Sequence, residues 1–178
     1  MSQALTDLIS LLTLECSGEH RFIGKGSTGD GAAATYGGHF LGQAISAALH
    51  DSDATFMLHS MHGYFLRGGI PNQPILYNVQ TIREGRSFCT KRVIASQENK
   101  INFELLASFN KKESGKNFES IATTDLSHIT LPENIEPYGD IMAKLDPLPL
   151  PEEWALREHG IDVRIVNAPW SSSGLSQQ

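Results

Sequence analysis

The segment Tyr36–His50, YGGHFLGQAISAALH, limits most strongly what this chain can fold into, because it reads as a helix that is apolar on nearly every side. A helix of this kind is stable only when other elements cover it. Its few polar side chains step by four, three and four residues, so they share one face; they are His39, Gln43, Ser46 and His50. The segment therefore predicts a buried helix that carries one polar stripe.

Four runs with strand character follow this helix, over residues 56–69, 74–84, 86–97 and 100–112. Gly85 predicts a hairpin between the second run and the third. Alternation is clearest in the last run, whose apolar face consists of Ile101, Phe103, Leu105, Ala107 and Phe109. Before the helix, residues 20–26 predict a short strand, and residues 2–15 predict an amphipathic helix with its leucines on one side.

The apolar face of such a sheet must be covered by another layer, and residues 38–50 are the only segment apolar enough to cover it. We therefore predict an α+β fold in which an antiparallel meander of four strands forms a curled sheet around one long central helix. Residues 113–159 are rich in Pro, Asp, Glu and Ser, which predicts a linker with a short helix near 138–145. Residues 160–167 then predict one further strand.

Composition excludes several classes of function. The net charge is −6 and no Lys/Arg cluster forms a stripe, so we expect no nucleic-acid partner. No apolar run reaches the roughly 18 residues that a membrane span needs. The first residues lack the basic start of a signal peptide, and Cys16 and Cys89 fit neither a metal spacing nor a disulfide framework. These features predict a cytoplasmic protein.

Several motifs occur in a specific order along residues 1–112, namely YGGHFLGQA, LHSMHGYFLRGG, REGRSFCTKRVIASQ and INFELLASF. In this combination the chain resembles the acyl-CoA thioesterase II family of hotdog-fold enzymes. The resemblance implies a hotdog fold and hydrolysis of fatty acyl-CoA to free fatty acid and CoA by a water molecule. It implies an acyl chain in an apolar tunnel beside the central helix, and no bound cofactor.

The family normally joins two hotdog repeats in tandem. By this resemblance, residues 1–112 correspond to the first repeat, residues 113–159 to the linker, and residues 160–178 to the opening strand of a truncated second repeat and a tail. The aspartate, Ser/Thr and glutamine that the family is thought to use for catalysis lie in the second repeat, so none of them maps to a residue here. The alternative is a non-catalytic hotdog module, or a truncated thioesterase, that binds acyl groups or assembles with a partner without turnover.

The central helix offers the first candidates for substrate binding and catalysis. The amide groups of Gly37 and Gly38 open the helix, where its dipole favours the negative charge that develops on a thioester oxygen. Ser46 stands about where the sister helix would carry its aspartate, and a serine cannot act as the base. Gln43 could orient water or the thioester, or instead satisfy carbonyl groups at the repeat interface. We expect the polar stripe to face the partner repeat.

Other candidates lie on the strands and in a turn. His59 is a candidate catalytic residue on an apolar face, with a hydrogen-bonded core histidine as the alternative, and His62 is expected on the opposite face. Arg86 and Ser87, in the turn after Gly85, could meet CoA phosphates, and solvated charge is the alternative.

Three further expectations concern partners and competing chemistries. No Asp, Glu or Cys completes a ligand set with the histidines, so we expect no metal site. The run GGHFLG is superficially like that of hotdog dehydratases, but residues 43–49 lack the acid that dehydration needs. A lone hotdog leaves a sheet edge and an apolar helix face unpaired, which predicts a homodimer formed through the hotdog sheets.

Overall fold

The structure is a computed structural model that describes residues 2–27, 34–116, 130–149 and 151–166, and the backbone of strands β7 (Trp170–Ser171) and β8 (Gly174–Leu175). The chain divides into two compact units, one of residues 9–116 and one of residues 1–8 with 117–178. Residues 28–33, which precede the predicted central helix, lie outside the described residues. The boundaries predicted at 112 and 159 remain predictions.

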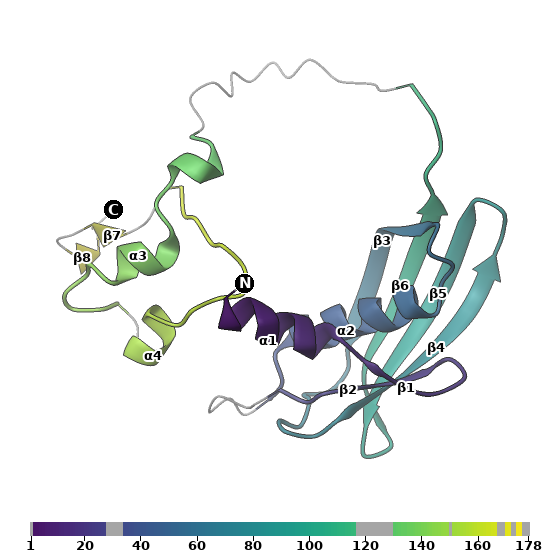
Figure 1. The fold of residues 1–178 in the computed structure, drawn as a ribbon. Helices are drawn as coiled ribbons and strands as arrows, with labels where there is room; N and C mark the ends of the chain where they lie inside the picture. Colours follow the sequence, from purple (N-terminus) through teal and green to yellow (C-terminus); the bar gives the residue numbers. More distant parts are fainter. Residues whose placement is uncertain are drawn as a thin grey trace. The chain divides into compact units, whose positions relative to one another are not determined.

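The unit of residues 9–116 is a six-stranded antiparallel sheet that curls around helix α2 (Figure 1). Its elements are the end of α1 (Gln3–Leu12), β1 (Glu15–Gly18), β2 (Arg21–Gly24), α2 (Gly37–His50), β3 (Phe56–Phe65), β4 (Ile75–Glu84), β5 (Phe88–Gln97) and β6 (Lys100–Lys111). The predicted hotdog architecture, a curled sheet around one long helix, is confirmed. Strand β1 was not predicted, because all four of its residues are exposed and they show no apolar alternation.

The strand order is β1-β2-β4-β5-β6-β3, so the predicted meander of four strands is wrong. Only β4, β5 and β6 form a meander, and β3 pairs with β6 at the far edge. The segment after β3 crosses the end of β6, where the N–H groups of Leu66 and Arg67 both donate to the Asn102 carbonyl. Local alternation identifies a strand, but it does not say which neighbour the strand takes.

The core lies between α2 and the inner face of the sheet. Phe40, Ala44, Ala47 and Ala48 of α2 pack against buried side chains that alternate along the strands, including Ile75, Tyr77, Val79, Val93, Ala95, Phe103, Leu105, Ala107 and Phe109. Ile101 does not belong to this inner face as predicted, because it is 38% exposed. The β5–β6 register shifts between Ala95, which pairs with Phe103, and Ser96, which pairs with Ile101. The neighbouring Asn102 is buried instead, and its side chain donates to Gly68 O and accepts from Gln97 N.

The other unit contains the short helices η1 (Pro132–Asn134), α3 (Tyr138–Met142) and α4 (Glu152–Ala155), and a small core of Met142, Leu145 and Ala155. Residues 160–166 do not form the predicted strand. Their backbone makes one isolated bridge, between Arg164 and Pro137, and Ile161 and Val163 stay exposed. A strand requires a neighbour along its length, and the described residues supply one only at Arg164.

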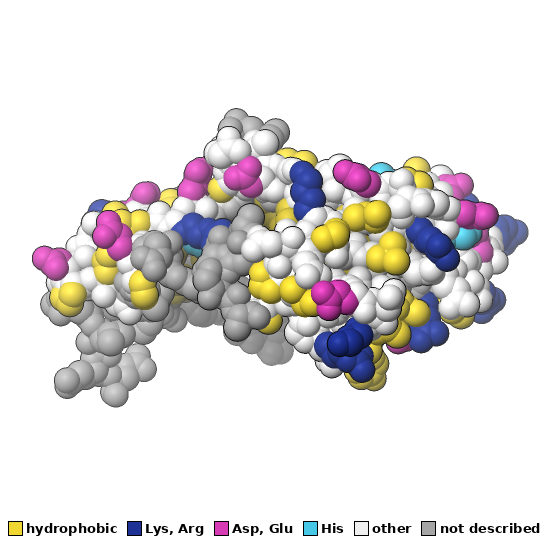
Figure 2. Space-filling model, turned by 90° about the horizontal axis from the view of Figure 1, so that it is seen from below, with side chains coloured by type: hydrophobic (Ala, Val, Ile, Leu, Met, Phe, Trp, Pro, Cys, Tyr) yellow, Lys and Arg dark blue, Asp and Glu magenta, His cyan; other side chains and the backbone are white. Residues whose placement is uncertain are grey.

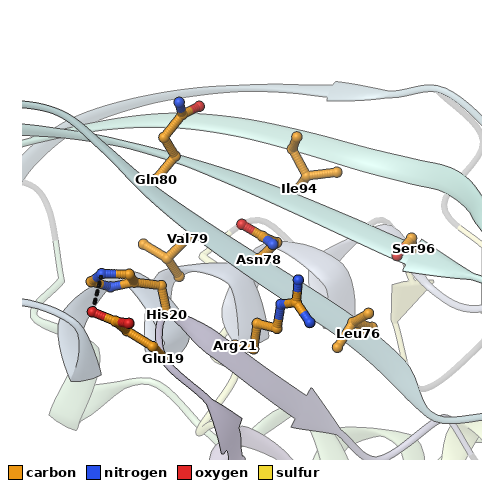
Figure 3. Close-up of a pocket in the computed structure, with 9 residues that line it drawn as sticks. All are labelled: Glu19, His20, Arg21, Leu76, Asn78, Val79, Gln80, Ile94 and Ser96. Carbon is orange, nitrogen blue, oxygen red and sulfur yellow. Dashed lines mark ion pairs between the residues drawn. The ribbon is translucent and has the colours of Figure 1, made fainter.

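The described surface mixes charged and apolar side chains. On the face shown in Figure 2, Lys and Arg side chains are dispersed among acidic and hydrophobic ones and form no continuous basic stripe. No helix in the described part of the chain is long and apolar enough to cross a membrane. On the outer face of the sheet, opposite α2, a hollow lies beside the turn between β1 and β2 (Figure 3).

Candidate functional site

The polar stripe of α2 faces the N-terminal segment of its own domain. The Gln43 side chain is fully buried, and its Nε2 donates to Leu11 O at 2.7 Å and to Lys25 O at 3.1 Å. Its Oε1 accepts a hydrogen bond from the Tyr77 hydroxyl at 2.9 Å. Catalysis by Gln43 stays a prediction, and it would require one of these three hydrogen bonds to break.

Ser46 continues the same pattern, because its hydroxyl donates to Leu12 O at 2.7 Å. Leu11 and Leu12 are the last residues of α1, so their carbonyls have no partner within that helix, and no basic residue lies in its last turn. Gln43 and Ser46 therefore cap the C-terminus of α1. The expectation that the stripe faces a partner repeat is wrong, because the stripe is used within the domain.

His39, on the first turn of α2, is buried and hydrogen-bonded through Nε2 to Lys25 O at 2.8 Å. A carbonyl can only accept, so Nε2 carries the proton. Burial lowers the pKa of His39, and the hydrogen bonds to Lys25 and Gln43 oppose this without reversing it. His39 is thus a neutral histidine that fastens the segment around Lys25 to α2.

Among the described residues, no side chain caps the N-terminal end of α2, which we call the open end. Tyr36 makes no side-chain cap, so the first N–H groups of the helix receive none from it. A Cβ on Gly37 would stand 2.9 Å from the Phe65 ring, and one on Gly38 would stand 2.4 Å from the Tyr36 ring. The two glycines therefore let aromatic rings approach the backbone closely. Tyr36 and Phe65 are exposed at this end, which gives it apolar surroundings, and Met61 is exposed farther along β3.

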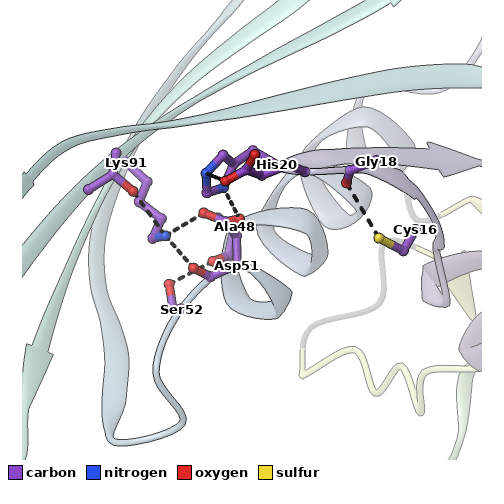
Figure 4. A network of polar contacts seen from close by, with 9 residues as sticks. Cys16, Gly18, His20, Ala48, Asp51, Ser52 and Lys91 are labelled. Atoms are coloured by element: carbon purple, nitrogen blue, oxygen red, sulfur yellow. Dashed lines mark hydrogen bonds and ion pairs between the residues drawn. The ribbon is translucent and has the colours of Figure 1, made fainter.

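The C-terminal end of α2 is closed by a charged network (Figure 4). Lys91 Nζ, only 1% exposed, donates to Asp51 O at 2.5 Å, to Asp51 Oδ2 at 2.6 Å and to Thr81 Oγ1 at 3.2 Å. His20 Nδ1 lies 2.5 Å from Asp51 Oδ1. Burial by itself raises the pKa of Asp51, but hydrogen bonds from Lys91 and His20, with their charges, outweigh it and lower that pKa.

This network was not predicted, although the sequence contains a signal for it. Alternation along β5 places Lys91 on the inner face, between Cys89 and Val93. A lysine at such a position needs a buried partner. The partner, Asp51, directly follows the helix.

A β-bulge in β3 changes the faces predicted for its histidines. Leu58 pairs with Phe109 and Ser60 with Ser108, so His59 is the extra residue. His59 Nε2 is hydrogen-bonded to Ser108 Oγ at 2.9 Å, on the outer face, and His62 faces outward opposite Leu106. The two histidines therefore share a face, contrary to the prediction. A catalytic role for His59 stays a prediction.

Arg86 and Ser87 lie in the turn between β4 and β5, where Ser87 O accepts a hydrogen bond from Lys111 N at 2.9 Å. This turn belongs to the end of the sheet where Lys91 contacts both Asp51 and Thr81. The structure thus does not bring Arg86 and Ser87 together with Gly37 and Gly38, which lie at the other end of α2. Binding of CoA phosphates by Arg86 stays a prediction. The described residues contain no group of three or more His, Cys, Asp or Glu that could hold a metal ion.

Residues 25–110 match the family described as the acyl-CoA thioesterase N-terminal domain. The chain is 34% identical, over 98% of its length, to "Acyl-CoA thioesterase 2" of Haemophilus influenzae, and it spans 61% of that relative. It is also 36% identical over 58% of its length to "Acyl-coenzyme A thioesterase 8" of Mus musculus, spanning 32% of that protein.

Solved structures agree with these relatives. The tesB protein of Mycobacterium avium subs paratuberculosis is similar with a TM-score of 0.62 and 33% identity, over 86% of this chain and 51% of that one. The TT0310 protein of Thermus thermophilus has a TM-score of 0.52 at 14% identity, over 63% of this chain and 100% of that one, which supports the fold alone.

Proposed function

We propose that this protein takes part in the hydrolysis of fatty acyl-CoA to a free fatty acid and CoA, because its residues 25–110 match the acyl-CoA thioesterase N-terminal domain and its relatives carry that name. The observation that carries the proposal is the open N-terminus of α2 within the residues that match the family. Gly37 and Gly38 present backbone N–H groups there that no side chain of the described residues caps, next to exposed apolar side chains. A thioester needs these two features, a donor for its carbonyl and an apolar surface for its acyl chain.

In the proposed reaction, the thioester oxygen accepts hydrogen bonds from the first N–H groups of α2, which stabilise the charge that develops when water attacks. The new C–O bond forms as the C–S bond breaks, and CoA leaves as the thiol. Each donor of this kind is worth about 3 kcal/mol in a preorganised site. The acyl chain lies along Met61 and Phe65.

The base that activates water is not supplied by α2. The helix carries no acidic residue from Gly37 to His50, and the Asp51 carboxylate is held by Lys91 and His20 at the other end. We infer that the carboxylate comes from a second hotdog unit placed against this one. We expect the second unit to bind along strand β3, because β3 is an edge strand with exposed apolar side chains on its inner side.

A homodimer through β3 would bring two such domains together, and the carboxylate would then come from outside the partner's α2, which carries no acid either. Sedimentation velocity at micromolar concentration tests this: a species twice the monomer mass supports it, and a folded monomer contradicts it. A substitution of Met61→Lys on the exposed edge should shift a dimer toward monomer. The cytoplasm and lipid metabolism remain the proposed setting, and free Cys16 and Cys89 agree with a reducing compartment.

The second candidate is a module that binds acyl-CoA without turnover. The use of Gln43 and Ser46 as caps for α1 favours it, because the polar side chains of the helix are then committed to structure. Residues 1–112 would be this module, residues 113–159 a linker and residues 160–178 the beginning of a further repeat.

Release of free thiol from palmitoyl-CoA separates the two candidates. The exposed Cys16 adds a fixed amount of thiol, so only a continuing increase counts as turnover. Steady turnover by the purified chain supports the thioesterase. Binding of a non-hydrolysable palmitoyl-CoA thioether without turnover supports the module, and the absence of both contradicts the proposed function.

A further inference from the structure

The hollow on the outer face of the sheet is separated from the open end of α2 by the sheet itself. It is lined by Glu19, His20, Arg21, Leu76, Asn78, Val79, Gln80, Ile94 and Ser96 (Figure 3). Leu76 and Asn78 alternate with Ile75 and Tyr77, which are buried against α2. The side chains of the hollow therefore point away from the core, and the thioesterase proposal does not involve them.

Four polar side chains of this hollow have no protein partner in the described part of the chain. Among the described residues, Arg21, Asn78, Gln80 and Ser96 make no side-chain hydrogen bond and no ion pair, although they come from three neighbouring strands. Arg92, on the same face, shows the contrast, because its Nε donates to Glu104 Oε1 at 2.7 Å. Arg92 thus has a carboxylate partner, whereas Arg21 has none among the described residues.

The charge in the hollow is positive at its centre. Arg21 pairs in register with Asn78, and Figure 3 shows its side chain reaching from β2 toward β4. The carboxylate at the rim, Glu19, is 90% exposed and lies 3.6 Å from His20 Nε2. His20 in turn is held by Asp51 through Nδ1. Arg21 is therefore the cation left for a ligand.

The remaining walls indicate the kind of ligand. Leu76 is 40% exposed and Ile94 is half-buried, and they lie diagonally across the β4–β5 pair. A guanidinium binds phosphate with two parallel N–H bonds, and carboxamides can read the edge of a planar polar group. Aliphatic side chains beside them favour a ligand with a flat body rather than a bare ion.

We propose that this hollow binds a phosphorylated nucleoside, with the phosphate on Arg21 and the nucleoside against Leu76 and Ile94. Such a group can come from a free nucleotide or from the phosphorylated adenosine of CoA. Both sources present the same chemistry, so the experiment must distinguish them.

Isothermal titration calorimetry with AMP, with CoA and with inorganic phosphate tests the proposal. The expected result is one saturable site for AMP or CoA, with phosphate alone at least about tenfold weaker. AMP binding at least as tight as CoA binding assigns a free nucleotide, and saturation by CoA alone that is weakened in Arg21→Gln assigns the phosphorylated adenosine of CoA. Equal affinity for phosphate, or no saturable binding of either nucleotide, overturns the proposal.

Variants locate the site. Arg21→Gln should weaken nucleotide binding by about tenfold to a hundredfold, the usual cost of a lost charged hydrogen bond. Arg83→Gln is the matched control, because it removes the same charge from β4 outside the hollow and should change binding less than about twofold. Asn78→Asp places a carboxylate opposite Arg21 in register and should also abolish binding. Equal losses in Arg21→Gln and Arg83→Gln would mean that only net charge matters, which also overturns the proposal.

Discussion

The two ends of helix α2 have opposite chemical surroundings. At its C-terminal end, Lys91, Asp51 and His20 form a network in which every N–H of the lysine ammonium has an acceptor. At its N-terminal end, Gly37 and Gly38 have no side-chain cap within the described part of the chain, and they lie beside exposed aromatic rings. A protein gains stability by satisfying helix ends, so an end left open in an otherwise well-satisfied domain is the better place to look for a ligand.

Removing Lys91 should produce the largest effect. Lys91→Met leaves the Asp51 carboxylate, 8% exposed, without its main partner, and we expect a loss of about 3–5 kcal/mol in the free energy of unfolding. Arg92→Met is the control, because Arg92 and Glu104 pair on the partly exposed outer face, where solvent screens the pair, and its loss should cost far less. Urea denaturation measures both. Equal losses of unfolding free energy in the two variants would show that Lys91 and Asp51 do not form a buried ion pair in solution.

Removing the Gln43 amide should come next. Gln43→Leu leaves the Tyr77 hydroxyl and two carbonyls without their partner, and we expect a loss of about 2–3 kcal/mol. Ser46→Ala removes one donor and should cost about 1 kcal/mol. Thiol release measured well below the unfolding temperature separates the roles of Gln43. A folded Gln43→Leu variant that loses all turnover would indicate catalysis rather than capping alone.

Acid should weaken the two ends in different pH ranges. Burial keeps the pKa of His39 below its usual value of about 6.5, so the unfolded chain takes up the proton first and stability falls as the pH drops below that value. The lowered pKa of Asp51 gives stability that is present above about pH 3.9 and is lost as the pH falls through the folded pKa.

Urea denaturation from pH 8 to pH 2 measures both phases. His39→Gln should remove the loss near pH 6, and Asp51→Asn should remove the loss below pH 4. A single transition that neither variant alters would contradict this assignment of the two ends.

The smallest effect on stability should come from the open end itself. Gly37→Ala places a methyl group against the exposed Phe65 ring, which can shift, so the free energy of unfolding should change by less than about 1 kcal/mol. The same methyl crowds the proposed approach to the helix N–H groups, so thiol release should fall by about tenfold or more. Gly139→Ala in α3, where a Cβ meets open space, should leave the rate unchanged. Unchanged turnover in Gly37→Ala would place the reaction elsewhere.

The sequence predicted what local patterns can encode. The apolar helix over 38–50 and the alternation along β4, β5 and β6 correspond to the buried helix and strands of the structure. The predictions for the neighbour of β3 and for the partner of the polar stripe were wrong, because both depend on residues far away in the chain. Gln43, for example, bonds to Leu11, which lies 32 positions earlier. The inward position of Lys91 was available from alternation alone.

The bulge in β3 has a consequence for comparing sequences of this kind. One supernumerary residue, His59, lets two histidines three positions apart stand on the same side of a pleated strand. Counting by twos along HSMHGYF therefore assigns one of them to the wrong surface. Deleting that single position would restore regular pairing between β3 and β6 and leave the later side chains of β3 on their present faces. Length variation at this point therefore changes the outer surface of the sheet without disturbing the core.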